Sequence, residues 1–450
     1  MPDEPIERHH FPGDLAEQVM RVWDAYLDGL VHARPPLPSA AQLRSLLEVA
    51  YLAGMEREEG RSLRFMLCCT PRSAIVHRLG QERIVESWPF GAPRPFNVQE
   101  IRRLAVTTDV DTAALWVEFA PEPDAPLAVR GLLNLGSSWA RARRAFAYSY
   151  DALPEALLVR VEAPGHLTIF QGSYVVATLR SGHIQVETPL STSDLLGAYP
   201  LFREGQKLLR SQITPPRFEV LRDWDQFEWL TYVNTILAIV NSIQAGGHGG
   251  ALILAADACD LSRAGHELVK IKYRLAADPT HLQRRFVEFM NIRHQYGDMV
   301  RQYAVDHAMP PQGQFSLGSL VDAQRKLAET CAFVGNLAAA DGALLLRSDL
   351  AVEGFGTEIL LDRVQQAPVY EIHNPFRGAR NAYDAEQRGT RHRSAMRLCA
   401  AVPDLCVFVI SQDGGVSLIW NDNGEVCIKS GIQTTGVFLS YSILVPMRMV

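Results

Sequence analysis

The sequence predicts an α/β protein built from two tandem units, each a mixed β-sheet flanked by helices, with a helical insertion in the second unit. Three observations support this fold class. Short apolar runs typical of buried strands alternate with helical patterns along the chain. Motifs of the first half recur in the same order in the second half, and residues 264–335 are dominated by helical periodicity.

Length and composition describe a globular protein with more than one core. The chain has 450 residues, of which 47% are hydrophobic and 21% charged, so it fits two or three domains of ordinary size. It has no apolar run of about eighteen residues and no signal-peptide core near its start. We therefore expect a cytoplasmic protein without a membrane segment.

Charge and cysteine usage exclude several function classes. The net charge is −6 and no long basic run occurs, so no electrostatic footprint for nucleic acid is present. The seven cysteines are an odd number, scattered, and without a C-x-x-C pair. We expect them to be reduced core residues rather than zinc or disulfide partners.

The first unit is expected to follow an N-terminal arm over residues 1–37, which ends at the proline cluster around Pro35-Pro36. Residues 38–200 then form an α/β unit. Its strands are expected at the apolar runs Leu63–Cys68, Ala113–Val117 and Ala156–Val161.

The second unit is expected over residues 215–450, after a boundary at Pro215-Pro216. Trp224–Ile243 reads as a long apolar helix, and Gly246–Gly250 as a tight turn into the strand Ala251–Ala255. This glycine-rich turn lacks the Lys-Ser/Thr of a P-loop. We therefore interpret it first as a tight helix-to-strand turn and second as a ligand contact.

The helical insertion and a hairpin complete the second unit. The insertion is expected to begin with a helix over His266–Ala276, and Asn421–Gly424 is a strong signal for a β-hairpin turn.

An internal repeat links the two units. Five segments of the first half parallel five of the second in the same order: Gly60–Leu67 with Gly247–Leu254, Thr112–Val117 with Asp341–Leu346, Leu127–Gly131 with Leu350–Gly354, Arg141–Phe146 with Arg391–Met396, and Pro154–Val161 with Pro403–Ile410. Chance similarity between α/β domains is the competing explanation.

Two short strings in the second unit carry candidate chemistry. Asp341-Gly342-Ala343 leads into an apolar run, and Gly389-Thr390-Arg391-His392-Arg393-Ser394 stands at the start of an expected helix. A carboxylate backed by glycine can orient a hydroxyl, and arginines at a helix N-terminus suit a polyphosphate. Each string alone also fits an ordinary turn or a solvated helix face.

The order of these strings, with Gly354–Glu358 between them and Cys406–Ser411 after them, resembles the diadenylate cyclase family. The resemblance covers residues 215–450 and implies an enzyme that condenses two ATP into cyclic di-AMP plus pyrophosphate. In that reaction each 3′ hydroxyl attacks the α-phosphate of the other nucleotide. Two catalytic domains must face each other, so at least a dimer is implied.

The resemblance also implies roles for individual residues. Asp341, Arg391 and Arg393 would be catalytic, and Asp341 would ligate Mg²⁺ or Mn²⁺. Thr390 is expected to cap the helix, and His392 either contacts phosphate or fixes the loop. The residues expected to bind ATP are Gly342, Ala343, Gly356, Ile359, Thr390, Arg391, His392, Arg393 and Ser394.

Departures from the family pattern leave a second function open. Some relatives carry a histidine where this chain has Ala340, and a glutamate where it has Gln412-Asp413. Asp413 is either a second metal ligand or a plain turn residue. In the first copy Thr112 replaces the aspartate and Ala142 the histidine, which indicates a sensor or regulatory module. The alternative function is therefore a non-catalytic sensor of a nucleotide or cyclic dinucleotide.

Overall fold

The computed structural model describes residues 9–24, 36–71, 86–135, 156–172, 174–180, 182–186, 192–217, 224–256, 261, 268–275, 278–306, 317–361, 367–372, 380–412, 414–432 and 434. The chain divides into two compact units: unit 1 is residues 1–143 with 147–190, and unit 2 is residues 191–450 with 144–146. The division lies before the Pro215-Pro216 pair. Residues 192–210 belong to unit 2 because Phe202 and Leu209 are buried there.

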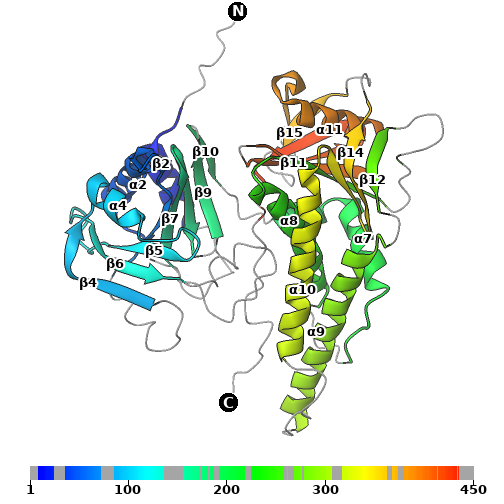
Figure 1. Ribbon diagram of the computed structural model, residues 1–450, viewed down its shortest axis with the longest axis horizontal. Coiled ribbons are helices and arrows are strands. Elements are labelled where there is room, and N and C mark those ends of the chain that lie inside the picture. The colour runs from blue at the N-terminus through cyan, green and yellow to red at the C-terminus, as the bar shows by residue number, and fades with distance from the viewer. Residues whose placement is uncertain are drawn as a thin grey trace, which may run out of the picture. The chain divides into compact units, whose positions relative to one another are not determined.

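Unit 1 is a mixed sheet covered on one face by helices (Figure 1). Within the described residues the sheet has eight strands in the order β10-β9-β8-β7-β3-β5-β6-β4. Its elements are α1 (Pro12–Val22), α2 (Ala40–Met55), β1 (Arg57–Glu58), β2 (Arg61–Ser62), β3 (Phe65–Cys69), β4 (Glu86–Pro95), α4 (Val98–Ala105), β5 (Ala113–Glu118), β6 (Ala128–Asn134), β7 (Leu157–Ala163), β8 (His166–Gln171), β9 (Tyr174–Arg180) and β10 (His183–Val186).

The expected N-terminal arm contains a helix that is part of the core of unit 1. Leu15 and Val19 on α1 are fully buried, in one cluster with Leu43 and Leu47 of α2. The repeat of apolar residues every three to four positions predicts this amphipathic helix. The prolines after it mark the link to α2 rather than the end of an unpacked arm.

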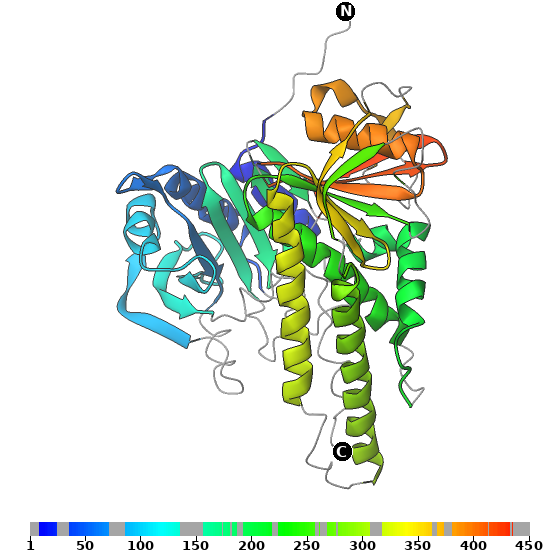
Figure 2. The ribbon, with the colours of Figure 1, turned by 45° about the vertical axis from the view of Figure 1, so that its right-hand side comes forward.

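Unit 2 is also a mixed sheet, with nine strands in its described part in the order β12-β14-β13-β11-β17-β18-β19-β15-β16. Figure 2 shows it beside its long helices. Its elements are α6 (Thr192–Gly197), α7 (Pro200–Arg210), α8 (Trp224–Ala245), β11 (Gly250–Ala255), β12 (Val269–Arg274), α9 (His281–Asp306), α10 (Leu317–Asn336), η1 (Leu337–Ala339), β13 (Ala343–Arg347), β14 (Val352–Ile359), β15 (Val369–Ile372), β16 (Arg380–Ala382), η2 (Ala385–Gln387), α11 (Thr390–Ala401), β17 (Leu405–Ile410), β18 (Val416–Asp422) and β19 (Glu425–Ser430).

The central strands of unit 2 are buried on both faces. Ile253 and Val407 pack with Ala395 and Leu398 of α11. The alternate side chains, such as Leu252 and Phe408, are also fully buried, on the side where α8 contacts β11 and β17. The continuous apolar runs of β11 and β17 follow from this double coverage. The expected hairpin turn is present, because Asn423 and Gly424 both have positive φ between β18 and β19.

The helical insertion consists of α9 and α10, which lie side by side (Figures 1 and 2). The helix expected over residues 266–276 is wrong. Residues 269–274 form the edge strand β12, paired with β14. The sequence Val269-Lys-Ile-Lys-Tyr-Arg alternates apolar and basic residues, which is the period of a strand.

The two units share one topology. In each, a parallel strand pair (β3 with β5, β11 with β13) lies between antiparallel neighbours, in the order β4-β6-β5-β3-β7-β8-β9 and β12-β14-β13-β11-β17-β18-β19. The strands follow each other along the chain in the same sequence. This correspondence over seven strands confirms the tandem architecture.

A shared irregularity strengthens the repeat. Trp116 pairs with Gly131 in unit 1 and Leu345 with Gly354 in unit 2, and each pair is followed by a register shift. A Cβ on either glycine would lie under 3 Å from a backbone oxygen of the next strand, at 2.3 Å for Gly131 and 2.6 Å for Gly354. The parallel between residues 60–67 and 247–254 is the exception, because strand pairing sets Leu67 opposite Leu115 and Leu252 opposite Leu344, two residues away from that alignment.

None of the helices that the structure describes combines the length and apolar character needed to cross a membrane. Six cysteines of the described residues are free and buried, which agrees with the expectation of reduced core residues.

Candidate functional site

The candidate site lies where β11 and β13 begin and β17 ends. β11 and β13 are parallel and Ala251 pairs with Ala343, so Gly249 and Asp341 occupy matching positions two residues upstream. Gly250 pairs with Ile410, the last residue of β17. Adjacent strands are about 4.8 Å apart, so the sheet brings Asp341 and the glycine-rich turn to one edge.

Arg391 reaches this edge from the first turn of α11. A Cβ built on Gly249 would lie 2.8 Å from Arg391 Nη1 and 2.9 Å from the Ile410 oxygen. Gly249 also has φ +66, a conformation that favours glycine. The turn that the sequence predicts before β11 is therefore also the surface on which the guanidinium of Arg391 rests.

The N-terminus of α11 has no side-chain cap. Gly389 is the N-cap residue and makes no side-chain cap hydrogen bond, while Thr390 is the first helical residue and is exposed. The expectation that Thr390 caps the helix is therefore wrong by one position. The first N–H groups of a helix have no partner within the helix and attract anions.

The other residues of the Arg-His-Arg string point elsewhere. His392 Nε2 lies 3.4 Å from Ser417 Oγ on β18, and Arg393 Nη1 lies 3.1 Å from Glu386 Oε2 on η2. Successive helical residues are rotated by about 100°, so neighbours cannot all face one phosphate. Of the two arginines, Arg391 is the one that contacts the edge at Gly249.

Asp341 and Gly342 pack against β14. Gly342 has φ +119, and a Cβ there would lie 2.5 Å from the carbonyl carbon of Gly356. The next residue, Thr357, is 2% exposed, and its Oγ1 has no hydrogen-bond partner. A buried hydroxyl without a partner is uncommon in folded proteins.

Two pairs of residues on β12 and β14 extend the site. Phe355 and Glu358 belong to the stretch Gly354–Glu358 that the sequence singled out, whereas their partners Tyr273 and Lys272 were not singled out. Lys272 Nζ lies 2.7 Å from Glu358 Oε1. This hydrogen bond is the main cause of the raised pKa of Lys272, to which the charges of Glu358 and Asp341 also contribute. The rings of Tyr273 and Phe355 are stacked, with centroids 4.8 Å apart.

The aromatic pair is accessible beside Asp341. Tyr273 is 54% exposed. A Cβ on Gly356 would lie 3.1 Å from Tyr273 Cδ2 and 3.4 Å from the backbone carbonyl oxygen of Asp341, so both residues flank the same glycine. The signal available in the sequence was the alternation of basic and apolar residues at 269–274, which we interpreted as a helix.

The remaining predicted residues have ordinary positions. Ala343 is buried in β13, Ile359 packs against the core at the end of β14, and Ser394 is half-buried on α11. Asp413 lies outside the described residues. Within the described residues no three His, Cys, Asp or Glu side chains form a group that could hold a metal ion. The Mg²⁺ or Mn²⁺ expected at Asp341 therefore stays a prediction.

Comparison with known families gives one match. Residues 32–134 match the family model described as a probable sensor domain DACNV. The matched residues run from the link before α2 to the end of β6, within unit 1. No curated protein matches the chain. A sensor domain is therefore indicated in unit 1.

This match corrects the assignment made from short motifs. The sequence was interpreted as a member of the diadenylate cyclase family, but the matching family is a sensor domain and not a catalytic one. That assignment is wrong. It depended on strings of three to seven residues, and the geometry of α11 shows the weakness of such strings, since Arg393 is engaged by Glu386 rather than aligned with Arg391.

Proposed function

We propose that this protein is a nucleotide sensor whose unit 2 binds a nucleoside triphosphate, with ATP as the ligand we expect. One observation carries the proposal. A single sheet edge has an arginine and an open helix N-terminus at one end, an accessible aromatic stack at the other, and Asp341 between them. These are partners for phosphate, base and sugar respectively.

The phosphate end is supported by Arg391 and α11. Arginine donates paired hydrogen bonds to phosphate oxygens, and the first N–H groups of α11 add dipolar attraction. Thr390 and Ser394 carry hydroxyl groups on the first turns of the same helix.

The base end is supported by Tyr273 and Phe355. Stacking of a base on an aromatic side chain contributes about 1–3 kcal/mol. From β11 to β12 the sheet crosses β13 and β14, which at about 4.8 Å per strand spacing is roughly 14 Å. A nucleoside triphosphate can bridge such a span, whereas inorganic phosphate cannot.

A sensing role is favoured over catalysis by two facts. The family match in unit 1 is to a sensor domain, and Arg393, two residues after Arg391 on α11, leaves another side of the helix and lies beside Glu386. Nucleotidyl transfer by Asp341 and the dimer that it requires remain predictions, which the experiments below also test.

Calorimetric titration of the full-length protein with ATP and with inorganic tripolyphosphate, in magnesium buffer, tests the site. Loss of a charged hydrogen bond costs about 1.5–3 kcal/mol, so Arg391→Gln should weaken both ligands about 10- to 100-fold. Tyr273→Ala should weaken ATP about 10-fold and leave tripolyphosphate unchanged. Arg397→Gln on α11 and Tyr370→Ala on β15 are the matched controls.

Equal losses of affinity in the control variants, or wild-type affinity in Arg391→Gln, would refute the proposed binding site.

Mass spectrometry after incubation with ATP and Mg²⁺ or Mn²⁺ distinguishes a sensor from an enzyme. Unchanged ATP supports the sensor. If the wild type instead forms a cyclic dinucleotide and pyrophosphate, and Asp341→Asn forms neither, the protein is an enzyme and the sensor proposal is wrong. Light scattering with and without ATP measures whether the protein forms a dimer.

A further inference from the structure

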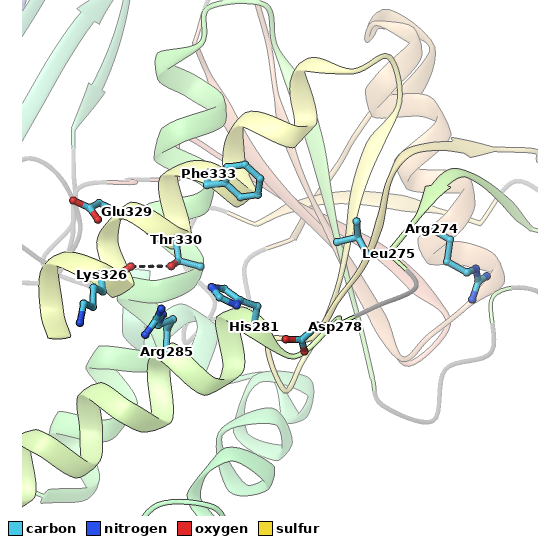
Figure 3. Close-up of a pocket in the computed structure, with 9 residues that line it drawn as sticks. All are labelled: Arg274, Leu275, Asp278, His281, Arg285, Lys326, Glu329, Thr330 and Phe333. Atoms are coloured by element: carbon cyan, nitrogen blue, oxygen red, sulfur yellow. Dashed lines mark hydrogen bonds between the residues drawn. The ribbon is translucent and has the colours of Figure 1, made fainter.

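A cavity of about 750 Å³ lies in unit 2, between the helical insertion and the end of β12 (Figure 3). Its walls come from Arg274 at the end of β12, from Leu275 and Asp278, from the first turns of α9, and from the second half of α10. A volume of this size is typical of sites for small organic ligands. No residue of the candidate nucleotide site lines it.

One end of the cavity is apolar. Phe333 is 67% exposed although it carries a large apolar ring, and Leu275 lines the cavity from the strand side. Figure 3 shows both side chains at the end of the cavity nearer the sheet. An exposed aromatic ring beside a hollow offers a stacking surface for a flat ligand group.

The other end is cationic. Arg285 of α9 and Lys326 of α10 both line the cavity, and Figure 3 draws them at the end away from Leu275, with His281 one helical turn before Arg285. Lys326, Thr330 and Phe333 are spaced four and three residues apart, so they share one stripe of α10. The two helices thus present a charged end and an aromatic end to the same space.

The charges of this end can be recruited by a ligand. Arg285 pairs with Glu288 at 2.6 Å, and Lys326 with Asp322 at 2.8 Å, each along its own helix. Such exposed ion pairs contribute about 0.3–0.5 kcal/mol to stability. A ligand anion held by both cations can therefore displace Glu288 and Asp322 at little cost.

The two acids of the lining are outnumbered by its cations. Arg274, Arg285 and Lys326 carry three positive charges, against the two negative charges of Asp278 and Glu329. Outside the lining, Arg284 pairs with Asp278, and Arg325 pairs with Glu329 at 2.6 Å and with Asp322 at 2.7 Å. The surroundings of the cavity therefore keep an excess of positive charge.

We propose that this cavity binds a small organic anion with a flat aromatic portion, its acidic group between Arg285 and Lys326 and its ring against Phe333. This inference is independent of the nucleotide site.

The probe is 1-naphthyl phosphate, whose fluorescence reports binding to the full-length protein. Phe333→Ala and the double variant Arg285→Gln/Lys326→Gln should each weaken it at least 10-fold. Val321→Ala on α10, also an exposed apolar residue at 43%, and Arg301→Gln, 16 residues beyond Arg285 on α9, should stay within twofold. Arg391→Gln should have no effect, which separates this cavity from the nucleotide site.

Two simpler ligands test the chemistry. Neutral 1-naphthol and inorganic phosphate should each bind at least 10-fold more weakly than the probe. The proposal is overturned if inorganic phosphate binds as tightly as the probe, if Phe333→Ala binds normally, or if the controls lose affinity equally. Because Phe333, Arg285 and Lys326 are outside the buried core, the variants should keep the wild-type unfolding midpoint, measured alongside.

Discussion

Single glycines decide where the charged groups of the candidate site can lie. Gly249 has no room for a side chain because Arg391 and the end of β17 occupy that space. Gly247, two residues earlier in the same turn, also has positive φ but nothing lies within 4 Å of a Cβ there. A side chain at Gly247 would therefore meet backbone strain alone, whereas one at Gly249 would meet both backbone strain and close contacts.

Alanine substitutions at these glycines should therefore differ. Gly247→Ala should cost about 1–2 kcal/mol of unfolding free energy from positive φ alone. Gly249→Ala should cost more, because its Cβ would also lie 2.9 Å from the Ile410 oxygen, and it should weaken ATP binding by displacing Arg391. Urea unfolding and calorimetry measure the two effects. Equal costs would show that the turn relaxes around the added methyl group.

The buried hydroxyl of Thr357 provides another residue-scale prediction. An unpaired buried hydroxyl costs about 1–3 kcal/mol, so Thr357→Val should leave stability unchanged or raise it by about 1 kcal/mol. In the control Thr235→Val, loss of the hydrogen bond from Oγ1 to the Thr231 oxygen should cost about 1 kcal/mol. Urea midpoints measure both. A loss in Thr357→Val as large as in the control would mean that this hydroxyl has a partner.

At the residue scale, sequence motifs indicated which segments form the candidate site, but not which side chains pair with each other there. Asp341-Gly342 and the start of α11 stand where the strings predict. The pairing of Arg393 with Glu386 and the stack of Tyr273 on Phe355 were not predicted. A stack between neighbouring strands depends on strand register, and a pattern within one segment does not contain that information.

At the scale of elements, the strands with continuous apolar runs were predicted well and the edge strand was not. β11 and β17 are buried on both faces, and their sequences contain little else but apolar residues. β12 at the edge of the sheet carries three basic residues, and its burial pattern is largely exposed. In the sequence this segment was interpreted as a helix over residues 266–276, the first of the helical insertion.

The helix α9 is attached to the segment before α8 by a buried histidine. His294 Nδ1 lies 2.8 Å from the Thr214 oxygen, and burial lowers the pKa of this histidine in the folded protein. The unfolded chain, with a histidine pKa near about 6.5, therefore takes up a proton first as the pH falls. Unfolding free energy should decrease below about pH 6.5.

His294→Gln should remove this part of the pH dependence, because glutamine can donate to the same carbonyl without titrating. Urea midpoints at pH 7.5 and 5.5, compared between wild type and variant, measure the difference. If the two proteins show the same difference between these pH values, His294 does not titrate differently in the folded and unfolded states.

At the scale of the whole molecule, the chain contains one topology twice. Unit 1 has the family match to a sensor domain, and unit 2 has the additional helices and the candidate site. Each unit has its own buried core. The repeat was visible in the sequence because corresponding positions of the two sheets need similar residues. The strands need apolar residues in register, and the bulge needs a glycine, Gly131 in unit 1 and Gly354 in unit 2.

Two cores should unfold as two transitions. In scanning calorimetry of the full-length protein we expect separate peaks, one of which matches a fragment of residues 1–190. A ligand stabilises only the unit that binds it, so ATP should raise the midpoint of the other peak alone. A shift of the peak shared with the fragment would relocate ATP binding to unit 1.

The connection from the insertion to Asp341 is short. α10 ends at Asn336, η1 ends at Ala339, and only Ala340 separates it from the carboxylate. A shift of α10 along its axis is therefore expected to move Asp341 as well. A ligand bound near Leu317, about 30 Å away at the other end of these twenty helical residues, would in this way affect the candidate site without touching the sheet.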